Sequence, residues 1–386
     1  MKLIYLSSIC PKSQNDYIMK NHLQSISIAA NKFNQLLVDG LSAQEGAEVS
    51  CIVSNIIHEM VEKNLTHKDY SAGGRDVYLK LHRGRFKYLK VLIETLKYIR
   101  SEQKANPNTV VVCDAVTTTY ALCCVFARFL YKIKTVGLIT DFPNIYVTRI
   151  KFADRLTFWC MKHFSSYIFL TEFMNCGLNK KGKPYCVIEG FCDINAHSRA
   201  NDLGNKYTNK VCIYAGFLYK QGNIAELIQA FDTPELQDYE LHIYGKGSYQ
   251  EEIAALCQKS RNAKYKGMVP NEEVLQEEAK ASLLINPRAT DEEYTKHSFP
   301  SKNMEYMASG TPLLTTKLPG MPPEYYDYVY LIEEETIEGM RKILIEILGK
   351  PADELHDKGM KAREFVLKEK NNILQAKKVL DLISKL

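Results

Sequence analysis

The sequence predicts an α/β protein with two domains, each built on a parallel β-sheet with helices on both faces. The chain has 386 residues, more than one domain usually holds. Along it, short apolar runs of strand length alternate with amphipathic stretches of helix length, which is typical of parallel sheets. A polar stretch near residue 200 divides this alternation into two series. We therefore expect two Rossmann-like domains rather than one very large sheet.

The first series contains apolar runs that we predict as strands. The N-terminal run is too short for a signal peptide and fits a first strand. Amphipathic patterns of helix length lie between the runs. The predicted strands are 3–6, 48–53, 109–113, 135–140, 167–170 and 185–188, and the predicted helices include 20–40, 76–100, 117–131 and 148–164.

The second series begins after the segment 190–209, which is polar and lacks helical periodicity, as linkers do. The tail 353–386 has the pattern of two amphipathic helices, with Phe365, Ile373 and Val379 among its apolar positions. The predicted strands of this series are 211–215, 240–244, 265–268, 282–286 and 312–315.

The composition is that of an ordinary globular protein, with 46% apolar and 25% charged residues. No apolar stretch approaches the roughly 20 residues needed to span a bilayer. The 11 cysteines include no Cys-x-x-Cys pair, which argues against a zinc knuckle or a disulfide framework and favours a reducing cytosol. The net charge of +5 fits an anionic ligand, a membrane surface or simple solubility, and no nucleic-acid recognition motif accompanies it.

A glycine ends the first strand of the second series, in KVCIYAGFLYKQGNIAELIQAF. Gly216 lies where the strand becomes a loop, and a glycine there lets backbone N–H groups approach an anion. The helix that follows adds the partial positive charge of its N-terminus, and Lys220 adds a full one. Taken alone, the glycine fits ordinary turn chemistry as well.

The stretch HSFPSKNMEYMASGTPLL predicts a helix whose start binds an anion. Ser298 fits a helix cap and Pro300 fits the first turn, so the N–H groups near Ser301 and Lys302 point out of the helix start. Glu305 lies about one turn further in, where its carboxylate can accept two ribose hydroxyls. A ligand with a phosphate and a ribose fits this pattern, and so does a capped helix with an incidental Lys302–Glu305 pair. Core positions follow at Met304, Met307 and Ala308, and Gly310 ends the helix.

These residues resemble the retaining glycosyltransferases of group 1 (family four), which have the two-domain GT-B fold. The resemblance covers most of the chain and is strongest from about 211 to 315. FLTEFMN and VIEGFCD in the first half also resemble members that build cell-surface polysaccharides. The segments that carry it are YAGFLYKQGNIAELIQAF, LHIYGKG, YKGMVPNEEVLQEEAKASLLINPR and HSFPSKNMEYMASGTPLL.

The resemblance implies roles for the residues around Glu305. The family signature is Glu, seven residues, Glu, so Glu305 is expected to bind the ribose hydroxyls of the donor. His297 stands at the first position, where members usually have a Glu that contacts the transferred sugar, and this departure leaves the sugar open. The resemblance places Ser298, Phe299 and Pro300 at the sugar pocket, and Ser301 and Lys302 at the diphosphate.

Other donor contacts follow from the same resemblance. Phe217 replaces the Arg that many members carry after the strand-end glycine, so Lys220 and Arg288 are the expected cations. Met268 and Val269 are expected to hold the nucleobase through their backbone. The donor is then a nucleotide sugar, with a UDP-sugar as the expectation. No cofactor and no metal ion are expected, since no Asp-x-Asp motif is evident.

Asp141, in TVGLITDFPN, ends a predicted strand of the first domain. Ligands bind at such strand ends, and many family members have a His or Asp there, so Asp141 is expected to contact the acceptor hydroxyl. A simple cap for the next turn is the alternative. Asp114 has the same topological position with weaker support. The predicted catalytic residues are Lys220, Glu305, His297 and Asp141.

The stretch 74–100 is rich in Lys and Arg and carries an apolar stripe. That composition suits a helix lying on an anionic membrane surface, or a solvated cationic helix whose stripe faces the core. A second segment with aromatic and basic residues, RIKFADRLTFWCMKHF, contains the single tryptophan, Trp159, and is a further candidate for contact with a membrane surface.

The predicted organisation is a Rossmann-like acceptor domain at 1–190, a linker at 191–209 and a Rossmann-like donor domain at 210–365. In the GT-B arrangement the two domains face each other across a cleft, and the C-terminal helix, 366–386, packs back on the first domain. We expect a cytoplasmic, retaining hexosyltransferase that extends a glycan or lipid-linked glycan in capsule or other surface polysaccharide synthesis. A peripheral contact with the inner face of the plasma membrane stays open. Alternatives are a nucleotide-sugar epimerase and a non-catalytic GT-B subunit that binds a partner.

Overall fold

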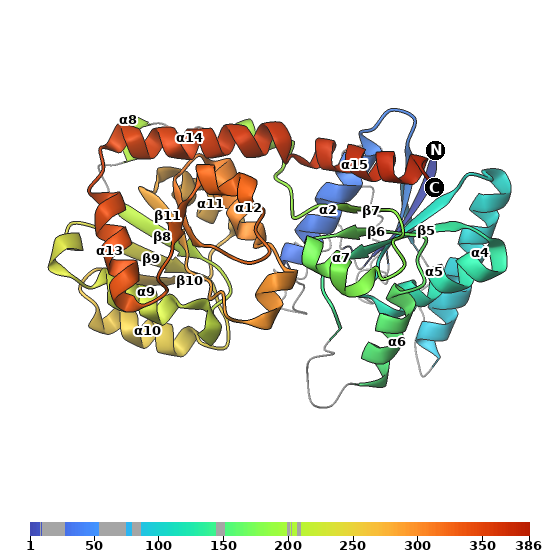
Figure 1. Cartoon of the computed structure of the whole chain (residues 1–386), viewed down its shortest axis with the longest axis horizontal. Helices are drawn as coiled ribbons and strands as arrows, with labels where there is room; N and C mark the ends of the chain where they lie inside the picture. Colours follow the sequence, from blue (N-terminus) through green and yellow to red (C-terminus); the bar gives the residue numbers. More distant parts are fainter. Residues whose placement is uncertain are drawn as a thin grey trace, which may run out of the picture. The chain divides into compact units, whose positions relative to one another are not determined.

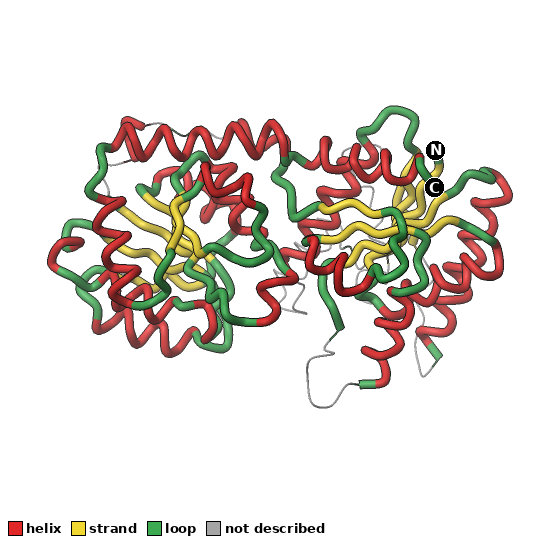
Figure 2. The backbone as a smooth tube through the Cα atoms, in the orientation of Figure 1, coloured by secondary structure: helices red, strands yellow, loops and turns green. Residues whose placement is uncertain are grey.

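The computed structural model describes residues 1–7, 9, 28–53, 75–78, 86–143, 151–198, 201, 203–206 and 210–386. The chain forms two compact units (Figure 1). Unit 1 consists of Met1–Phe191 together with Asn372–Leu386, and unit 2 consists of Cys192–Asn371. In each unit, helices flank a central sheet (Figure 2).

The sheet of unit 1 has seven strands in the order β3-β2-β1-β4-β5-β6-β7, and neighbouring strands are parallel. The chain therefore winds outward in one direction from β1 and in the other from β4, so the order switches between these two strands. The strands are β1 (Lys2–Ser7), β2 (Glu48–Val53), β3 (Arg75–Tyr78), β4 (Val110–Asp114), β5 (Lys134–Ile139), β6 (Ser166–Phe169) and β7 (Tyr185–Val187).

Helices cover both faces of this sheet because its strands are apolar on both sides. Ile4 and Leu6 point into a core with α4, α5, α6 and α7, and Leu3 and Tyr5 point into a core with α2 and α15. The helices are α2 (Ile28–Ser42), α4 (Lys87–Ala105), α5 (Thr118–Tyr131), α6 (Phe152–Met161), α7 (Glu172–Leu178) and α15 (Asn372–Ser384).

The sheet of unit 2 has six parallel strands in the order β10-β9-β8-β11-β12-β13. One core packs α9, α10 and α13 on one face, and another packs α12 and α14 on the other. The strands are β8 (Val211–Ala215), β9 (Glu240–Tyr244), β10 (Ala263–Gly267), β11 (Leu283–Asn286), β12 (Leu313–Thr316) and β13 (Tyr330–Ile332). The helices are α8 (Leu203–Lys206), α9 (Ile224–Phe231), α10 (Gln250–Lys259), α11 (Asn271–Lys280), α12 (Ser301–Ser309), α13 (Ile337–Leu348) and α14 (Ala352–Glu369).

The predicted fold class is confirmed, and every predicted strand overlaps an observed one. Two observed strands were missed, β3 and β13, and both lie at a sheet edge. They are short, with four and three residues, so their sequence carries too little periodicity to distinguish strand from helix.

The prediction of one continuous helix in the basic stretch 74–100 is wrong. Arg75–Tyr78 forms β3, which pairs in parallel with β2, and α4 begins only at Lys87. Val77 packs against the core of unit 1, so burial at the sheet edge overrides the helical pattern. Residues 79–85 of the stretch lie outside the described part of the chain.

The domain boundaries differ in detail from the predicted ones. The predicted linker contains the 3-10 helix η1 (Ile194–Ser198) and α8, and it belongs to unit 2. Lys206 of α8 is fully buried, with its Nζ donating to Asn201 Oδ1 at 2.7 Å and to Gly310 O at 3.4 Å. The return to unit 1 begins at Asn372, because α14 continues beyond 365 as one helix. From there α15 packs on α2 of unit 1.

Candidate functional site

The carboxyl ends of β8 and β11 mark the candidate site in unit 2. The strand order switches between these two neighbours, and ligands of such sheets bind at the carboxyl ends beside the switch. Gly216 directly follows β8, and Arg288 follows β11 by two residues. The sequence therefore placed its candidates on the two loops that the topology favours.

Gly216 lies against the side chain of Lys302. The Gly216 N–H donates to Tyr244 O at 2.9 Å. A Cβ at position 216 would lie only 2.7 Å from Lys302 Cε and 2.5 Å from Tyr214 Oη. The fold thus brings together two predicted site residues that lie far apart in the sequence, and only a glycine leaves room for the lysine.

The loop after β9 supports the Gly216 loop from the other side. Gly245 has φ +129°, and a Cβ there would lie 1.8 Å from Gly216 O. The Leu218 N–H donates to Lys246 O at 3.0 Å, and the Tyr249 N–H donates to Leu218 O at 3.1 Å. These contacts fix the loop between β8 and the next helix. The sequence indicated Gly216, but not the backbone packing that holds it.

Tyr306 fixes α12 against the end of β8. Its hydroxyl oxygen accepts from the Ala215 N–H at 2.8 Å, and the hydroxyl donates to Ala215 O at 3.2 Å. The residue is fully buried, and this burial raises the pKa of the Tyr306 hydroxyl well above its ordinary value. Ala215 directly precedes Gly216, so these hydrogen bonds set where Lys302 and Glu305 of α12 lie relative to that glycine. Sequence reasoning missed it.

A buried polar network positions the same helix from the side of β11 and β12. Asn286 Nδ2 donates to Asn303 Oδ1 at 2.7 Å, and Asn303 Nδ2 donates to Thr315 Oγ1 at 3.3 Å. Thr315 Oγ1 donates back to Asn286 O at 3.1 Å. All three residues are buried and joined by these hydrogen bonds, so the network favours one orientation of α12.

The N-terminus of α12 is not capped as predicted. The helix begins at Ser301, its N-cap residue is Pro300, and no side chain caps it. Ser298 lies two residues further back in an extended conformation, so its prediction as the cap is wrong. Phe299 and Pro300 are buried, and the Phe299 ring packs on Tyr325 at 4.9 Å between centroids. The first turn of a helix without a cap presents N–H groups that an anion can accept from.

His297 and Glu305 flank this helix start. His297 is the last residue of the 3-10 helix η4 (Glu293–His297) and is 7% exposed. A hydrogen bond from Lys296 lowers the pKa of Glu293, and the His297 side chain contributes a smaller effect. Glu305 is half-buried, one helical turn after Lys302.

Lys220 and Arg288 lie on two loops that are joined. Lys220 is exposed at the start of the 3-10 helix η2 (Lys220–Gly222). The Ala289 N–H donates to Gln221 O at 3.4 Å, which links the loop after β8 to the loop after β11. The Glu335 carboxylate adds a second link, because it accepts from the Thr290 N–H at 3.1 Å and from Asn223 Nδ2 at 3.4 Å. Sequence reasoning missed Glu335.

Met268 and Val269 follow the end of β10. The Gly245 N–H donates to Gly267 O at 2.8 Å, so this loop lies beside the loop that supports Gly216. Met268 is 45% exposed, and Val269 packs against the core. The segment predicted to hold the base is thus connected to the Gly216 loop through Gly245.

In unit 1, the two predicted acids differ in their surroundings. Asp141 is exposed, and its Oδ1 accepts from the Phe142 N–H at 2.8 Å. Asp114 ends β4 and is buried, with its carboxylate accepting from Asn34 Nδ2 and from the Val116 N–H, each at 3.4 Å. Burial raises the pKa of Asp114, and hydrogen bonds from Val116, Asn34 and Thr140 oppose that rise.

Helices α4, α5 and α6 of unit 1 carry large exposed apolar side chains. Helices α4, α5 and α6 lie side by side (Figure 1). The predicted stripe of α4 is split, because Ile99 is buried while Tyr88 and Leu89 are exposed. Exposed side chains on these helices are Tyr88, Leu89, Ile93, Phe126, Phe129, Leu130, Phe152 and Trp159.

Neither a metal site nor a membrane span is found among the described residues. Among them, no group of three or more His, Cys, Asp or Glu side chains is arranged to hold a metal ion. No helix in the described part of the chain has the length and apolar character needed to cross a bilayer.

Residues 198–365 match the family model described as Glycosyl transferases group 1. These residues form a group 1 glycosyltransferase domain. The match spans the candidate site from Gly216 to Glu305, and the resemblance seen in the sequence is confirmed at this level. No curated protein matches the sequence closely enough to count as a relative.

Solved glycosyltransferase structures share the fold of the entire chain. Sucrose-phosphate synthase from Thermosynechococcus elongatus aligns with a TM-score of 0.70 at 13% identity, covering 100% of this chain and 98% of that one. HepE of Anabaena, solved with UDP and glucose, aligns with a TM-score of 0.67 at 13% identity, with both chains covered completely. The lipopolysaccharide outer core galactosyltransferase WaaB aligns at 0.64 and 14% identity, again over both chains. The chain therefore has the two-domain GT-B fold of these structures.

Proposed function

We propose that this protein is a group 1 glycosyltransferase that moves a hexose from a UDP-sugar to a glycan hydroxyl, with retention of the anomeric configuration. The observation that carries the proposal is the contact between Lys302 and Gly216 at the switch of the unit 2 sheet, beside the uncapped start of α12. A lysine, a loop of close-packed backbone and a helix N-terminus meet there, and each favours a diphosphate.

The diphosphate, ribose, hexose and base of the donor each contact a different part of this surface. The diphosphate takes the N–H groups of the first turn of α12, near Ser301 and Lys302, with Lys220 and Arg288 adding positive charge from the joined loops. Glu305 lies one turn deeper and accepts the two ribose hydroxyls. His297, Ser298, Phe299 and Pro300 line the position of the hexose, and the backbone of Met268 and Val269 holds the base.

Catalysis is mostly electrostatic in this proposal. Cleavage of the anomeric bond leaves negative charge on the diphosphate and positive charge on the sugar ring. Lys302, Lys220 and the helix start stabilise the departing diphosphate, and one preorganised contact of this kind contributes on the order of 3 kcal/mol. The departing phosphate oxygen takes the acceptor proton on the same face of the sugar, so the configuration is retained and no metal ion is needed.

The choice of UDP rests on neighbours of the same fold. Structures of HepE contain UDP, UDP with glucose, or UDP-glucose, and a TarM variant was solved with UDP. The acceptor is proposed to be a surface glycan or a lipid-linked glycan, with Asp141 contacting its hydroxyl. The printed description of WaaB, a galactosyltransferase of the lipopolysaccharide outer core, supports an acceptor of this class.

The apolar and basic face of unit 1 supports a cytoplasmic enzyme at the inner face of the plasma membrane. On α4, Tyr88 and Leu89 are exposed next to Lys87 and Lys90, which are exposed as well. Aromatic side chains with neighbouring lysines favour the headgroup region of an anionic bilayer. Surface polysaccharide or capsule synthesis on a lipid carrier needs such a contact.

Exchange of Glu305 for glutamine tests the donor site. Glu305→Gln keeps the size of the side chain but weakens the hydrogen bonds to ribose, so UDP should bind about 10- to 100-fold more weakly. Calorimetric titration with UDP measures the loss of binding. Transfer from radiolabelled UDP-hexoses to a glycan extract measures the accompanying loss of activity. The exposed Glu338→Gln on α13 is the matched control and should behave like the wild type.

A thermal-shift screen identifies the donor, because a ligand that binds only the folded protein raises the apparent stability of the protein. The screen compares UDP, GDP and ADP and their hexose derivatives. Equal UDP affinity in wild type and Glu305→Gln would contradict the assignment of the ribose site. Incubation with the donor alone provides a further check, since an altered free sugar would indicate an epimerase. Nucleotide binding without turnover on any lipid-linked glycan would indicate a non-catalytic subunit.

A further inference from the structure

A cationic cavity opens at the amino ends of the strands of the unit 1 sheet. Its volume is about 480 Å³. Five of the side chains that line it are basic, namely Arg128, Lys132, Lys134, Lys183 and Lys385. No Asp or Glu side chain is among the described residues that line it, and Leu386, which also lines it, carries an α-carboxylate in this structure. The glycosyltransferase site proposed above does not use this cavity.

Segments that are distant in sequence supply the five basic residues. Arg128 lies in the last turn of α5, and Lys132 is the C-cap residue of that helix. Lys134 begins β5, Lys183 lies two residues before β7, and Lys385 follows α15. The cavity therefore lies at the strand starts, whereas Asp114 and Asp141 lie at the strand ends.

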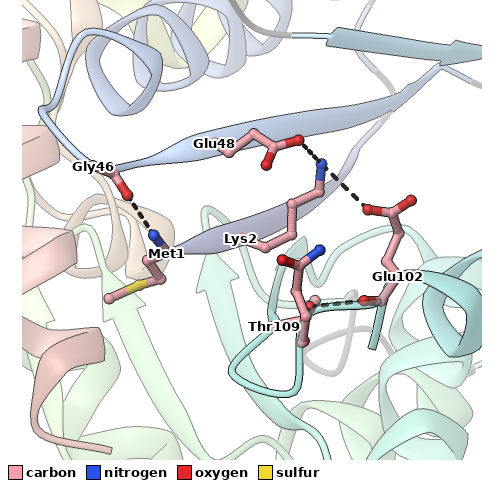
Figure 3. Close-up of polar contacts among 7 residues, drawn as sticks. Met1, Lys2, Gly46, Glu48, Glu102 and Thr109 are labelled. Atoms are coloured by element: carbon pink, nitrogen blue, oxygen red, sulfur yellow. Dashed lines mark hydrogen bonds and ion pairs between the residues drawn. The ribbon is translucent and has the colours of Figure 1, made fainter. Parts of the chain in front are cut away.

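The same edge of the sheet shows how a lysine is neutralised elsewhere. Lys2, at the start of β1, places its Nζ 2.5 Å from Glu48 Oε1 and 3.3 Å from Glu102 Oε2 (Figure 3). Burial lowers the pKa of Lys2, but the hydrogen bonds to Glu48 and Glu102 outweigh it and raise the pKa overall. None of the five cations of the cavity makes an ion pair with a carboxylate of the described chain.

Two of the five cations are held in place by uncharged groups. Arg128 Nη1 donates to His163 O and Phe164 O, and Lys183 Nζ donates to Lys162 O at 2.9 Å and to Tyr167 Oη at 3.2 Å. Burial, with repulsion from Arg128 and Lys181, lowers the pKa of Lys183 to about 8. The carbonyls orient the cations without removing their charge, so the site favours an anion.

We propose that this cavity binds a phosphate group. Lys132, Lys134 and Lys385 are exposed at its rim, where three ammonium groups can donate to phosphate oxygens, and Arg128 and Lys183 form its wall. The ligand is a phosphate monoester or diester, either the headgroup of an anionic phospholipid or a free phosphorylated compound. Phe129 and Leu130, 63% and 64% exposed, adjoin Arg128 on α5 and suit the lipid.

The test exchanges two rim lysines for glutamate. Inorganic phosphate is titrated into the full chain by calorimetry, with and without saturating UDP to occupy the donor site. Binding to sedimented phosphatidylglycerol vesicles is measured beside phosphatidylcholine vesicles. The Lys134→Glu/Lys385→Glu double variant should bind one of these two probes at least about tenfold more weakly. The control is Lys361→Glu/Lys368→Glu on α14, which changes the net charge equally at exposed positions outside the cavity.

The outcomes separate the sources of the phosphate. If the Lys134→Glu/Lys385→Glu variant binds inorganic phosphate more weakly than the wild type, the ligand is a soluble phosphate compound. If only its binding to phosphatidylglycerol vesicles is weakened, the ligand is a lipid headgroup. Equal weakening in both double variants, or no binding of either probe by the wild type, would overturn the proposal. UDP-induced thermal shifts on the same preparations report the donor site separately, so the two proposals can fail independently.

Discussion

Tyr306 is the residue that couples α12 to the sheet of unit 2. Its hydroxyl is bonded to both the N–H and the C=O of Ala215 inside a buried environment. The neighbouring Glu305 is proposed to bind the ribose of the donor, and its position depends on the hydrogen bonds of Tyr306 to Ala215. Side chains that hold a functional group in place in this way are hard to predict from sequence, because a buried tyrosine resembles any other core residue.

The Tyr306→Phe variant should therefore be less stable and bind UDP less well. The Ala215 N–H loses its acceptor in a buried site, so the free energy of unfolding should fall by about 1–3 kcal/mol. Urea denaturation followed by circular dichroism measures the loss, and calorimetry measures UDP affinity. Tyr249→Phe serves as the control, because the Tyr249 side chain packs at the edge of the core and is not part of the proposed site. An unchanged stability would show that the anchor is dispensable.

Lys206 is the second residue whose surroundings have a measurable consequence. It is fully buried, and burial, with repulsion from Arg363, lowers its pKa to about 7. The unfolded chain binds this proton up to its ordinary pKa of 10.5. Between about pH 7 and pH 10 the unfolded state therefore holds more protons, and the contribution of Lys206 to stability rises with pH.

Exchange of Lys206 for methionine should remove this dependence. The difference in unfolding free energy between wild type and Lys206→Met should change in favour of the wild type as pH rises from 7 to 10, by at most about 1.4 kcal/mol per pH unit. Parallel urea titrations at several pH values give the slope. A difference that is independent of pH would mean that Lys206 keeps its proton in the folded state.

At the scale of elements, the loop after β8 and the start of α12 meet at the proposed donor site. The sequence indicated both, and even the glycine and the lysine involved. It could not show that Lys302 crosses Gly216, because strand order and helix packing decide which loops become neighbours. Gly216 has two reasons to be a glycine, namely the approach of the Lys302 side chain and the close Tyr214 hydroxyl.

Gly216→Ala should impair donor binding more than it impairs folding. The new methyl group meets Lys302 Cε, the far part of a flexible side chain, so the lysine must move away from the proposed diphosphate position. We expect UDP affinity to fall about tenfold, the loss of one charge-assisted contact. Gly177→Ala is the control, since a Cβ there meets Phe142 at an ordinary 3.5 Å. Wild-type UDP affinity in Gly216→Ala would place the diphosphate elsewhere.

At the scale of the whole molecule, the chain ends in the unit in which it began. Helix α15 belongs to unit 1, although unit 2 precedes it, and its apolar face completes the core beside α2. The single tryptophan, Trp159, also lies in unit 1. The stability of unit 1 should therefore depend on α15. Unfolding of unit 1 should be visible as a change in Trp159 fluorescence.

A charge placed in this core tests the dependence. Val379 is fully buried, so Val379→Asp should lower the unfolding free energy of unit 1 by about 3–5 kcal/mol, the cost of an unpaired buried charge. Trp159 fluorescence should show an earlier thermal transition, whereas protection of unit 2 by UDP should be retained. Lys378→Asp, at the exposed neighbouring position, is the control. Coincident loss of both units would show that they unfold together.

The sequence by itself determined the fold class and the strands of both sheets except β3 and β13, and it predicted the segments of the proposed donor site. Periodicity and strand-end glycines suffice for this, because they reflect local geometry and burial. Tertiary structure alone decided that Arg75–Tyr78 is a strand, that Pro300 rather than Ser298 precedes α12, and that Tyr306, Asn303 and Glu335 hold the site together. The physical reason is that these features depend on partners distant in the chain, and a local pattern does not specify which partners the packing brings near.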